Sequence, residues 1–264
     1  MPSLRRHATQ VRRSSRTLAV YGVAAVAGAQ LCYFNAVEHL SVAVALLLEY
    51  SGSLLVVLWL WLRHQHRPTT ATVVGALAAT AGLALVLDVF GDVEIDVVGV
   101  AWGLGAAVGL AVYFVISART DDALPPLLTA WCGLVVGGVT LGVAALLGVI
   151  SFTVSASEVT LLDRSVSWLV PLLGMSVVAG AFAYVAGVVG ARSLGARLAS
   201  FVGLTEVLFA VLFAWLAIDE SLGVVQLAGG ALVLAGIVLV KLGEGESPGD
   251  VELSGTPGTT VVTG

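Results

Sequence analysis

Charged side chains are scarce in this sequence of 264 residues, because Asp, Glu, Lys and Arg make up 11% of it. A soluble domain carries roughly 25% charged residues. Hydrophobic residues make up 58% of the chain. So few charges cannot cover a water-facing surface, which excludes a soluble globular fold. We therefore predict an integral membrane protein whose main partner is the lipid bilayer.

Cysteine is also rare. Cys32 and Cys132 both lie inside apolar runs. Buried free thiols are expected there rather than a disulfide, because free cysteine behaves as a small buried hydrophobe.

Motifs for catalysis or metal binding are missing from the sequence. His64 and His66 lie in a basic stretch without a neighbouring acid or thiol, so no metal site is expected. The glycines at 103, 105 and 109 lie inside an apolar span with no preceding strand, so they predict close helix packing rather than a phosphate loop. We expect no enzyme, no cofactor and no nucleic-acid partner.

Eight apolar segments are present, each close to the roughly 20 residues that a bilayer span needs. They cover residues 18–37, 40–62, 70–87, 97–118, 127–150, 168–191, 198–218 and 222–240. The runs are continuous rather than alternating, which favours helices over barrel strands. The predicted fold is an all-α integral membrane protein with eight transmembrane helices. Residues 1–16 form a basic segment, and residues 244–264 form an acidic tail rich in Gly, Pro, Ser and Thr that we expect to be disordered.

The charges between these segments indicate the orientation. If the N-terminus is cytoplasmic, every Lys and Arg except Arg164 falls on the inside, and the loops outside carry mainly Asp and Glu. This distribution follows the positive-inside rule. We predict a multi-pass protein of the cell membrane with both termini in the cytoplasm.

An internal repeat organises the chain. Residues 40–86 recur as residues 194–240 at a constant shift of 154 positions, which places Gly75 on Gly229 and Gly82 on Gly236. The first copy begins outside and the second begins inside, so the repeats are inverted. Inverted repeats are typical of secondary transporters.

The repeat also predicts the domain organisation. The first unit would span residues 17–90 with three helices, and the second residues 97–243 with five. An inverted repeat needs an odd number of helices per unit, so the first unit would lack two helices before Met1. We expect a chain shortened at its N-terminus; the alternative is a native eight-helix protein.

Several segments resemble EamA-type transporters of the drug/metabolite transporter superfamily. They are the sequences at residues 180–184, 194–200, 205–215 and 226–231. The family often has a proline after the glutamate of the third segment, where this chain has Val207. The resemblance implies a ten-helix architecture of two inverted five-helix repeats, incomplete here. It also implies secondary transport of small metabolites or amphipathic compounds, most often export.

Glu49 and Glu206 are the formal charges inside the apolar segments. Each lies about nine residues into its helix, so ~13 Å deep at 1.5 Å per residue. An ionised, unpaired carboxylate at that depth costs several kcal/mol. Each glutamate is therefore expected to be protonated, paired or facing a cavity. One hypothesis is that it binds a proton or a cationic part of the substrate; the other is that it is a neutral acid that ties two helices together.

Other polar side chains at membrane depth could line a cavity and contact a small-molecule substrate, or could hydrogen-bond to one another across helices. They are Gln30, Tyr33, Asn35, Tyr113, Tyr184 and Thr205.

Two functions follow from these patterns. The first is a multi-pass secondary transporter that exports its substrate by alternating access, with proton coupling through the buried acids. The second is a transport-inactive truncated remnant, or a membrane interaction protein. A homodimer is compatible with either function.

Overall fold

The computed structural model describes residues 10–64, 67–89, 96–119, 124–148, 159–161, 164–218 and 223–245. These residues are almost entirely helical. The first half contains α2 (Ser15–Val20), the π-helix η1 (Tyr21–Gly28), α3 (Ala29–His39), α4 (Val42–Tyr50), α5 (Gly52–His64) and α6 (Thr70–Val86). The second half contains α7 (Val97–Ser117), α8 (Pro126–Leu146), α9 (Leu169–Gly174), the π-helix η2 (Met175–Phe182), α10 (Ala183–Gly203), α11 (Thr205–Ile218) and α12 (Val224–Gly245).

Six helical segments of the described chain are long and apolar enough to cross a membrane. They are Ser15–His39, Val42–Arg63, Val97–Ser117, Pro126–Leu146, Leu169–Gly203 and Val224–Glu244, and the apolar helix Thr70–Val86 is shorter. The prediction of an all-α membrane protein is confirmed, whereas the number of eight crossings stays a prediction. The one departure in the described residues is a short antiparallel hairpin of β1 (Val159–Leu161) and β2 (Arg164–Val166), which the hydropathy pattern did not predict.

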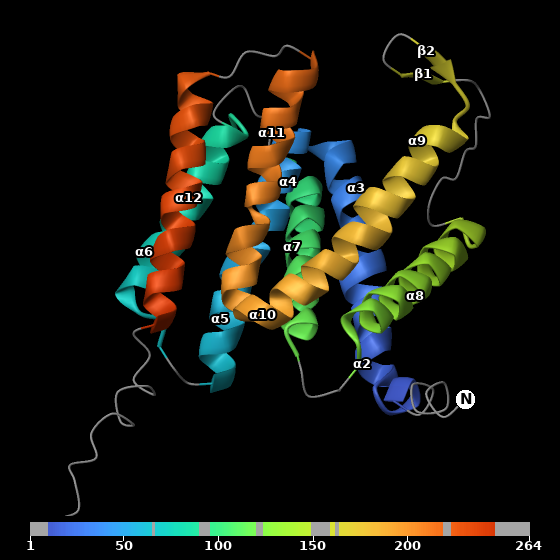
Figure 1. The fold of residues 1–264 in the computed structure, drawn as a ribbon, viewed down its shortest axis with the longest axis horizontal. Helices are drawn as coiled ribbons and strands as arrows, with labels where there is room; N and C mark the ends of the chain where they lie inside the picture. Colours follow the sequence, from blue (N-terminus) through green and yellow to red (C-terminus); the bar gives the residue numbers. More distant parts are fainter. Residues whose placement is uncertain are drawn as a thin grey trace, which may run out of the picture.

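The chain runs back and forth between the two ends of the bundle (Figure 1). α2 begins and α12 ends at the same end, where α5 also ends and α6 begins (Figure 1). α6 ends and α7 begins at the opposite end (Figure 1). Asp88 closely follows α6, and Asp96 caps α7. Asp88 and Asp96 thus lie at the end of the bundle away from the basic residues of α2 and of the last turn of α5.

The bounds of the helices recur at the same shift of 154 residues as the sequence. α2 at Ser15–Val20 corresponds to α9 at Leu169–Gly174, and η1 at Tyr21–Gly28 corresponds to η2 at Met175–Phe182. π-helices are rare, so their presence at equivalent positions is stronger evidence for a repeat than matched leucines. The likeness extends N-terminal to residue 40, where the same shift also places Ala25 on Ala179 and Ala29 on Ala183.

α7 lies at the centre of the bundle and packs against α3, α4, α5 and α10. Its glycines allow these close approaches. A Cβ added at Gly103 would lie 2.6 Å from Leu48 Cδ1, and one added at Gly109 would lie 2.6 Å from Ala29 Cβ. The prediction that this glycine series serves helix packing is confirmed.

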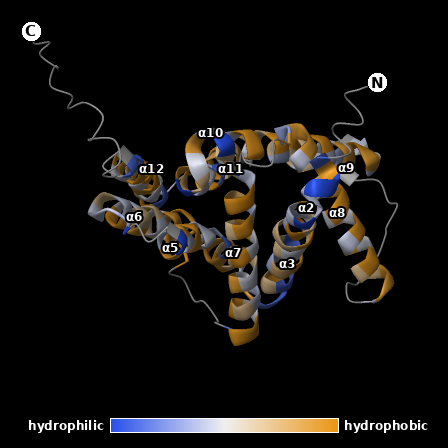
Figure 2. Ribbon diagram, turned by 90° about the horizontal axis from the view of Figure 1, so that it is seen from below, coloured by the Kyte–Doolittle hydropathy of each residue, from blue (hydrophilic) through white to orange (hydrophobic). Residues whose placement is uncertain are grey.

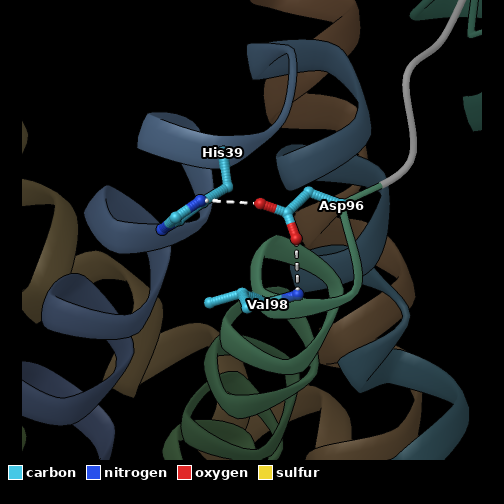
Figure 3. A network of polar contacts seen from close by, with 3 residues as sticks. All are labelled: His39, Asp96 and Val98. Carbon is cyan, nitrogen blue, oxygen red and sulfur yellow. Dashed lines mark hydrogen bonds and ion pairs between the residues drawn. The ribbon is translucent and has the colours of Figure 1, made fainter.

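Polar side chains fix where several helices begin. Asp96 accepts a hydrogen bond from the Val98 backbone N–H at 2.8 Å and so caps α7 (Figure 3). Its other carboxylate oxygen pairs with His39 Nδ1, also at 2.8 Å, on the last turn of α3 (Figure 3). Ser41 and Thr69 cap α4 and α6 in the same manner.

Many large apolar side chains are exposed, and most of the helical ribbon is coloured hydrophobic (Figure 2). Phe34, Leu77, Leu146 and Phe213 are all more than half exposed. Such a surface is stable only in contact with lipid, since soluble monomers rarely expose large contiguous apolar patches.

Candidate functional site

A cavity of about 540 Å³ lies between the two copies of the repeat. The first copy contributes residues of η1, α3 and α4, and the second contributes residues of η2, α10 and α11. Leu110, Tyr113 and Phe114 of the central helix α7 complete the wall. Helix bundles commonly bind small ligands at such a position, and pockets of 300–1,000 Å³ are typical.

Both membrane-depth carboxyl groups line this cavity. Glu49 comes from the last turn of α4 and is half-buried, and Glu206 comes from the first turn of α11 and is exposed. The Tyr50 hydroxyl donates a hydrogen bond to Glu206 Oε2 at 3.1 Å. This bond joins α4 of the first copy to α11 of the second across 156 residues of sequence.

The two glutamates are not equivalent under the repeat, and packing explains why. The position that corresponds to Glu206 in the first copy is Gly52, where an added Cβ would lie 2.6 Å from the Ala107 carbonyl oxygen. The position that corresponds to Glu49 is Gly203, where an added Cβ would lie 3.1 Å from Phe114 Cζ. α7 therefore leaves no room for a long side chain at Gly52, and little at Gly203.

Tyrosines form an aromatic wall on one side of the cavity. The Tyr113 ring packs edge-to-face against Tyr184, with centroids 5.7 Å apart and ring planes at 87°. It meets Phe114 at 5.1 Å and 81°. Tyr21 stacks on Tyr113 at 5.8 Å. Tyr33 and Tyr50 also line the cavity.

The remaining predicted site residues are placed differently from one another. Gln30 and Thr205 line the cavity, although the Thr205 hydroxyl, at the start of α11, donates to the Val202 carbonyl near the end of α10 at 2.7 Å. Asn35 is absent from the described lining, and its side-chain amide donates to the Leu31 carbonyl at 2.7 Å. Polarity at membrane depth cannot separate residues that line the cavity from Asn35, because it does not show which face of the helix a residue occupies.

Sequence reasoning missed Tyr50. The signal was its position next to Glu49 inside an apolar span, where a tyrosine hydroxyl needs a hydrogen-bond partner. Only the contact between the two copies reveals that the partner is Glu206 rather than a neighbour in the chain.

The described lining of the cavity contains no Lys, Arg or His. Arg192, on α10, is engaged away from it: Nη1 donates to the Leu124 carbonyl at 2.6 Å and Nη2 donates to Thr129 Oγ1 at 3.0 Å. Among the residues that the structure describes, no cluster of His, Cys, Asp and Glu could hold a metal ion. Cys32 and Cys132 are both free thiols; Cys132 is buried as expected from the sequence, whereas Cys32 is half-buried.

The comparison with protein families is decisive for the class of this protein. The model of the EamA-like transporter family matches residues 3–88 and 97–242. The chain belongs to this family. It is thus a multi-pass membrane transporter, and the EamA resemblance stated from the sequence segments is confirmed.

Ten chains of solved structures also match this EamA-like transporter. One, described as "Crystal structure of protein", is 24% identical, with a TM-score of 0.66 over 84% of this chain and 76% of the other. At that identity the likeness establishes the fold alone. A search of curated proteins found no match.

Proposed function

We propose that this EamA-like transporter is a secondary exporter of small metabolites or amphipathic compounds, coupled to protons through Glu49 and Glu206. The observation that carries the proposal is the cavity of about 540 Å³ between the two copies, with both carboxyl groups on its lining. A carboxyl group at membrane depth is a functional-site hypothesis by default, because its burial is costly unless it serves a pathway or a partner.

Alternating access is the proposed mechanism. The helices that border the cavity are interrupted at equivalent places. In the first copy the break lies at Ser41, between α3 and α4. In the second copy it lies at Gly195, which corresponds to Ser41 at the shift of 154 and is non-helical with a φ of 78°. A second pair of breaks lies at Ser51, between α4 and α5, and at Thr205, where α11 begins. Ser51 and Thr205 also correspond at the shift of 154. Breaks at equivalent positions allow the two copies to rock against each other around a fixed site.

The two acids suit an exchange of proton and substrate. Either carboxyl group can hold a proton in its neutral form or pair with a cationic group of the substrate in its ionised form, but not both at once. The Tyr50 hydroxyl holds the Glu206 carboxyl group in the cavity, where the two alternatives compete. Exchange at such a site couples substrate export to proton entry.

The proposed location is the cell membrane with both termini in the cytoplasm. Arg16 lies in α2, Arg63 in the last turn of α5 and Lys241 in the last turns of α12. α2 begins and α5 and α12 end at the same end of the bundle (Figure 1). The positive-inside rule assigns that end to the cytoplasm.

Transport in everted membrane vesicles tests the proposal. A panel of amphipathic compounds is first screened for the one that cells lacking their own exporters tolerate better when they express this chain. We expect a pH gradient to drive that compound across the vesicle membrane, and we expect Glu206→Gln to abolish the flux. Asp88→Asn, a change of the same kind at a turn outside the cavity, is the control and should transport normally.

Two results would contradict the proposal. Unchanged flux in Glu206→Gln would remove the coupling role of this residue. Failure of the wild-type chain to move any compound would favour a transport-inactive membrane interaction protein.

A further inference from the structure

The electrostatic character of the cavity follows from its side chains. Glu49 and Glu206 both line it, and no basic residue belongs to its described lining. A cleft lined by one sign of charge and enclosed by apolar walls concentrates ligands of the opposite sign. An anionic substrate would have no cationic partner in the described lining, and the carboxylate of a zwitterion would have none either.

The shape of the wall adds a second requirement. Tyr113 and Tyr184 pack edge-to-face at 5.7 Å, so that they form a rigid aromatic corner, and Phe114 extends it at 5.1 Å from Tyr113. Aromatic faces attract cations and stack on flat apolar groups. The lining also includes the small residues Ala25, Ala29 and Gly190, which leave room beside the aromatic corner.

The hydrogen bond from Tyr50 fixes one of the acids. With its hydroxyl at 3.1 Å from Glu206 Oε2, Tyr50 restricts the carboxyl group to the cavity side of α11. The volume of about 540 Å³ accommodates a drug-sized molecule, but not a folded peptide.

We propose that the cavity selects organic cations with a flat aromatic body, with the cationic nitrogen at Glu49 and Glu206 and the aromatic body against Tyr113 and Tyr184. The proposal rests on the proposed transport function for its biological meaning, but the binding site can be tested without transport.

Equilibrium binding to the purified full-length chain in detergent is the direct experiment. The probe is 1-methylquinolinium, a flat aromatic cation. Its neutral counterpart of the same shape is 1-methylnaphthalene, and its anionic counterpart is 1-naphthoate. Tetrapropylammonium supplies the charge without an aromatic body. We expect saturable binding of 1-methylquinolinium, at least about tenfold tighter than that of any of the other three.

Substitutions then assign the site. Glu206→Gln should weaken binding of 1-methylquinolinium by about tenfold or more, because it removes one member of an ion pair in a partly desolvated cavity. Tyr184→Leu should weaken it by about two- to tenfold, as expected for the loss of an aromatic contact with a cation. Asp88→Asn should bind like the wild type. If a thermal scan shows that Glu206→Gln is not folded, Glu49→Gln takes its place in the binding test.

The result that overturns the proposal is equal or tighter binding of 1-methylnaphthalene or 1-naphthoate, or unchanged binding of 1-methylquinolinium in both glutamate variants. The outcome is separable from that of the transport test. Binding of the cation without flux of any compound supports the cation site and contradicts the transport function. Flux of a neutral or anionic compound without cation binding supports the transport function and contradicts the cation site.

Discussion

Gly75 and Gly236 face each other across the contact between α6 and α12. A Cβ added at Gly75 would lie 2.6 Å from the Gly236 carbonyl oxygen, and one added at Gly82 would lie 2.7 Å from the Gly229 carbonyl oxygen. Under the shift of 154 residues, Gly75 corresponds to Gly229 and Gly82 to Gly236. Gly75 therefore contacts the equivalent of Gly82, and Gly82 contacts the equivalent of Gly75. A two-fold axis between the antiparallel helices requires this crossed pairing.

This crossed pairing predicts that the α6–α12 contact is sensitive to a single methyl group. Gly236→Ala places a methyl group against the backbone of the opposite helix, and the helices must separate. We expect a loss of about 1–3 kcal/mol of stability, the usual range for overpacking. Thermal unfolding in detergent measures it, and Gly75→Ala should give a similar loss.

Gly138→Ala on α8 is the matched control. An added Cβ there has no neighbour within 4 Å, so the substitution should leave the unfolding temperature unchanged or raise it slightly through higher helix propensity. Equal destabilisation by the control and by Gly236→Ala would show that the effect is not one of close helix contact.

Tyr50→Phe tests the hydrogen bond that joins the two copies at the cavity. The ring is retained, and the donor to Glu206 Oε2 is removed. We expect proton-driven flux to fall by about tenfold, because hydrogen bonds to carboxylates contribute about 1.5–3 kcal/mol. The unfolding temperature should fall as well, because the same bond joins α4 to α11.

Tyr21→Phe provides a comparison for that experiment. Tyr21 is also buried, but its hydroxyl accepts a hydrogen bond from Ser117 at 3.5 Å and it is absent from the described lining. Its flux should remain close to that of the wild type. A fall as large as that in Tyr50→Phe would mean that any tyrosine hydroxyl in this region affects flux.

Asp96 is predicted to stabilise the start of α7 mainly as a helix cap. Asp96→Ala removes the acceptor of the Val98 N–H and the partner of His39 together. Loss of an N-cap costs about 0.5–2 kcal/mol. Asp96→Asn retains a cap acceptor and loses only the charge, and exposed ion pairs contribute about 0–1 kcal/mol. Chemical unfolding should therefore show a clearly larger loss for Ala than for Asn.

Gly195 is predicted to be required for its backbone conformation rather than for space. Its φ is 78°, and an added Cβ would meet no atom within 4 Å. Gly195→Ala should thus destabilise the break in α10 by about 1 kcal/mol or more, since alanine disfavours positive φ. Gly174→Ala, also with open space and without a positive φ, should be tolerated. Equal unfolding temperatures for the two variants would contradict this explanation.

The sequence predicted the features that follow from hydropathy and from charge. Continuous apolar runs identified membrane helices, and the separation of Arg from Asp and Glu matches the two ends of the bundle. Glu49 and Glu206 were identified because burial of a charge is costly at any position.

Other features depend on which residues meet in space, which hydropathy does not encode. The π-helices at Tyr21–Gly28 and Met175–Phe182 have no distinct residue pattern. Asn35 satisfies its side chain within its own helix and is absent from the described cavity lining. Tyr50 became identifiable only through its partner on α11.

The inversion of the two copies is the central claim, and cysteine accessibility in intact cells tests it most directly. Cys32 and Cys132 are first replaced by alanine. Single cysteines are then introduced as Asp88→Cys and Leu242→Cys, which are mates at the shift of 154, and as His39→Cys and Ser193→Cys, a second pair of mates. We expect a membrane-impermeant maleimide to label Asp88→Cys and His39→Cys from outside, and to label Leu242→Cys and Ser193→Cys only after the membrane is opened. Labelling of both members of a pair from the same side would contradict the inverted arrangement.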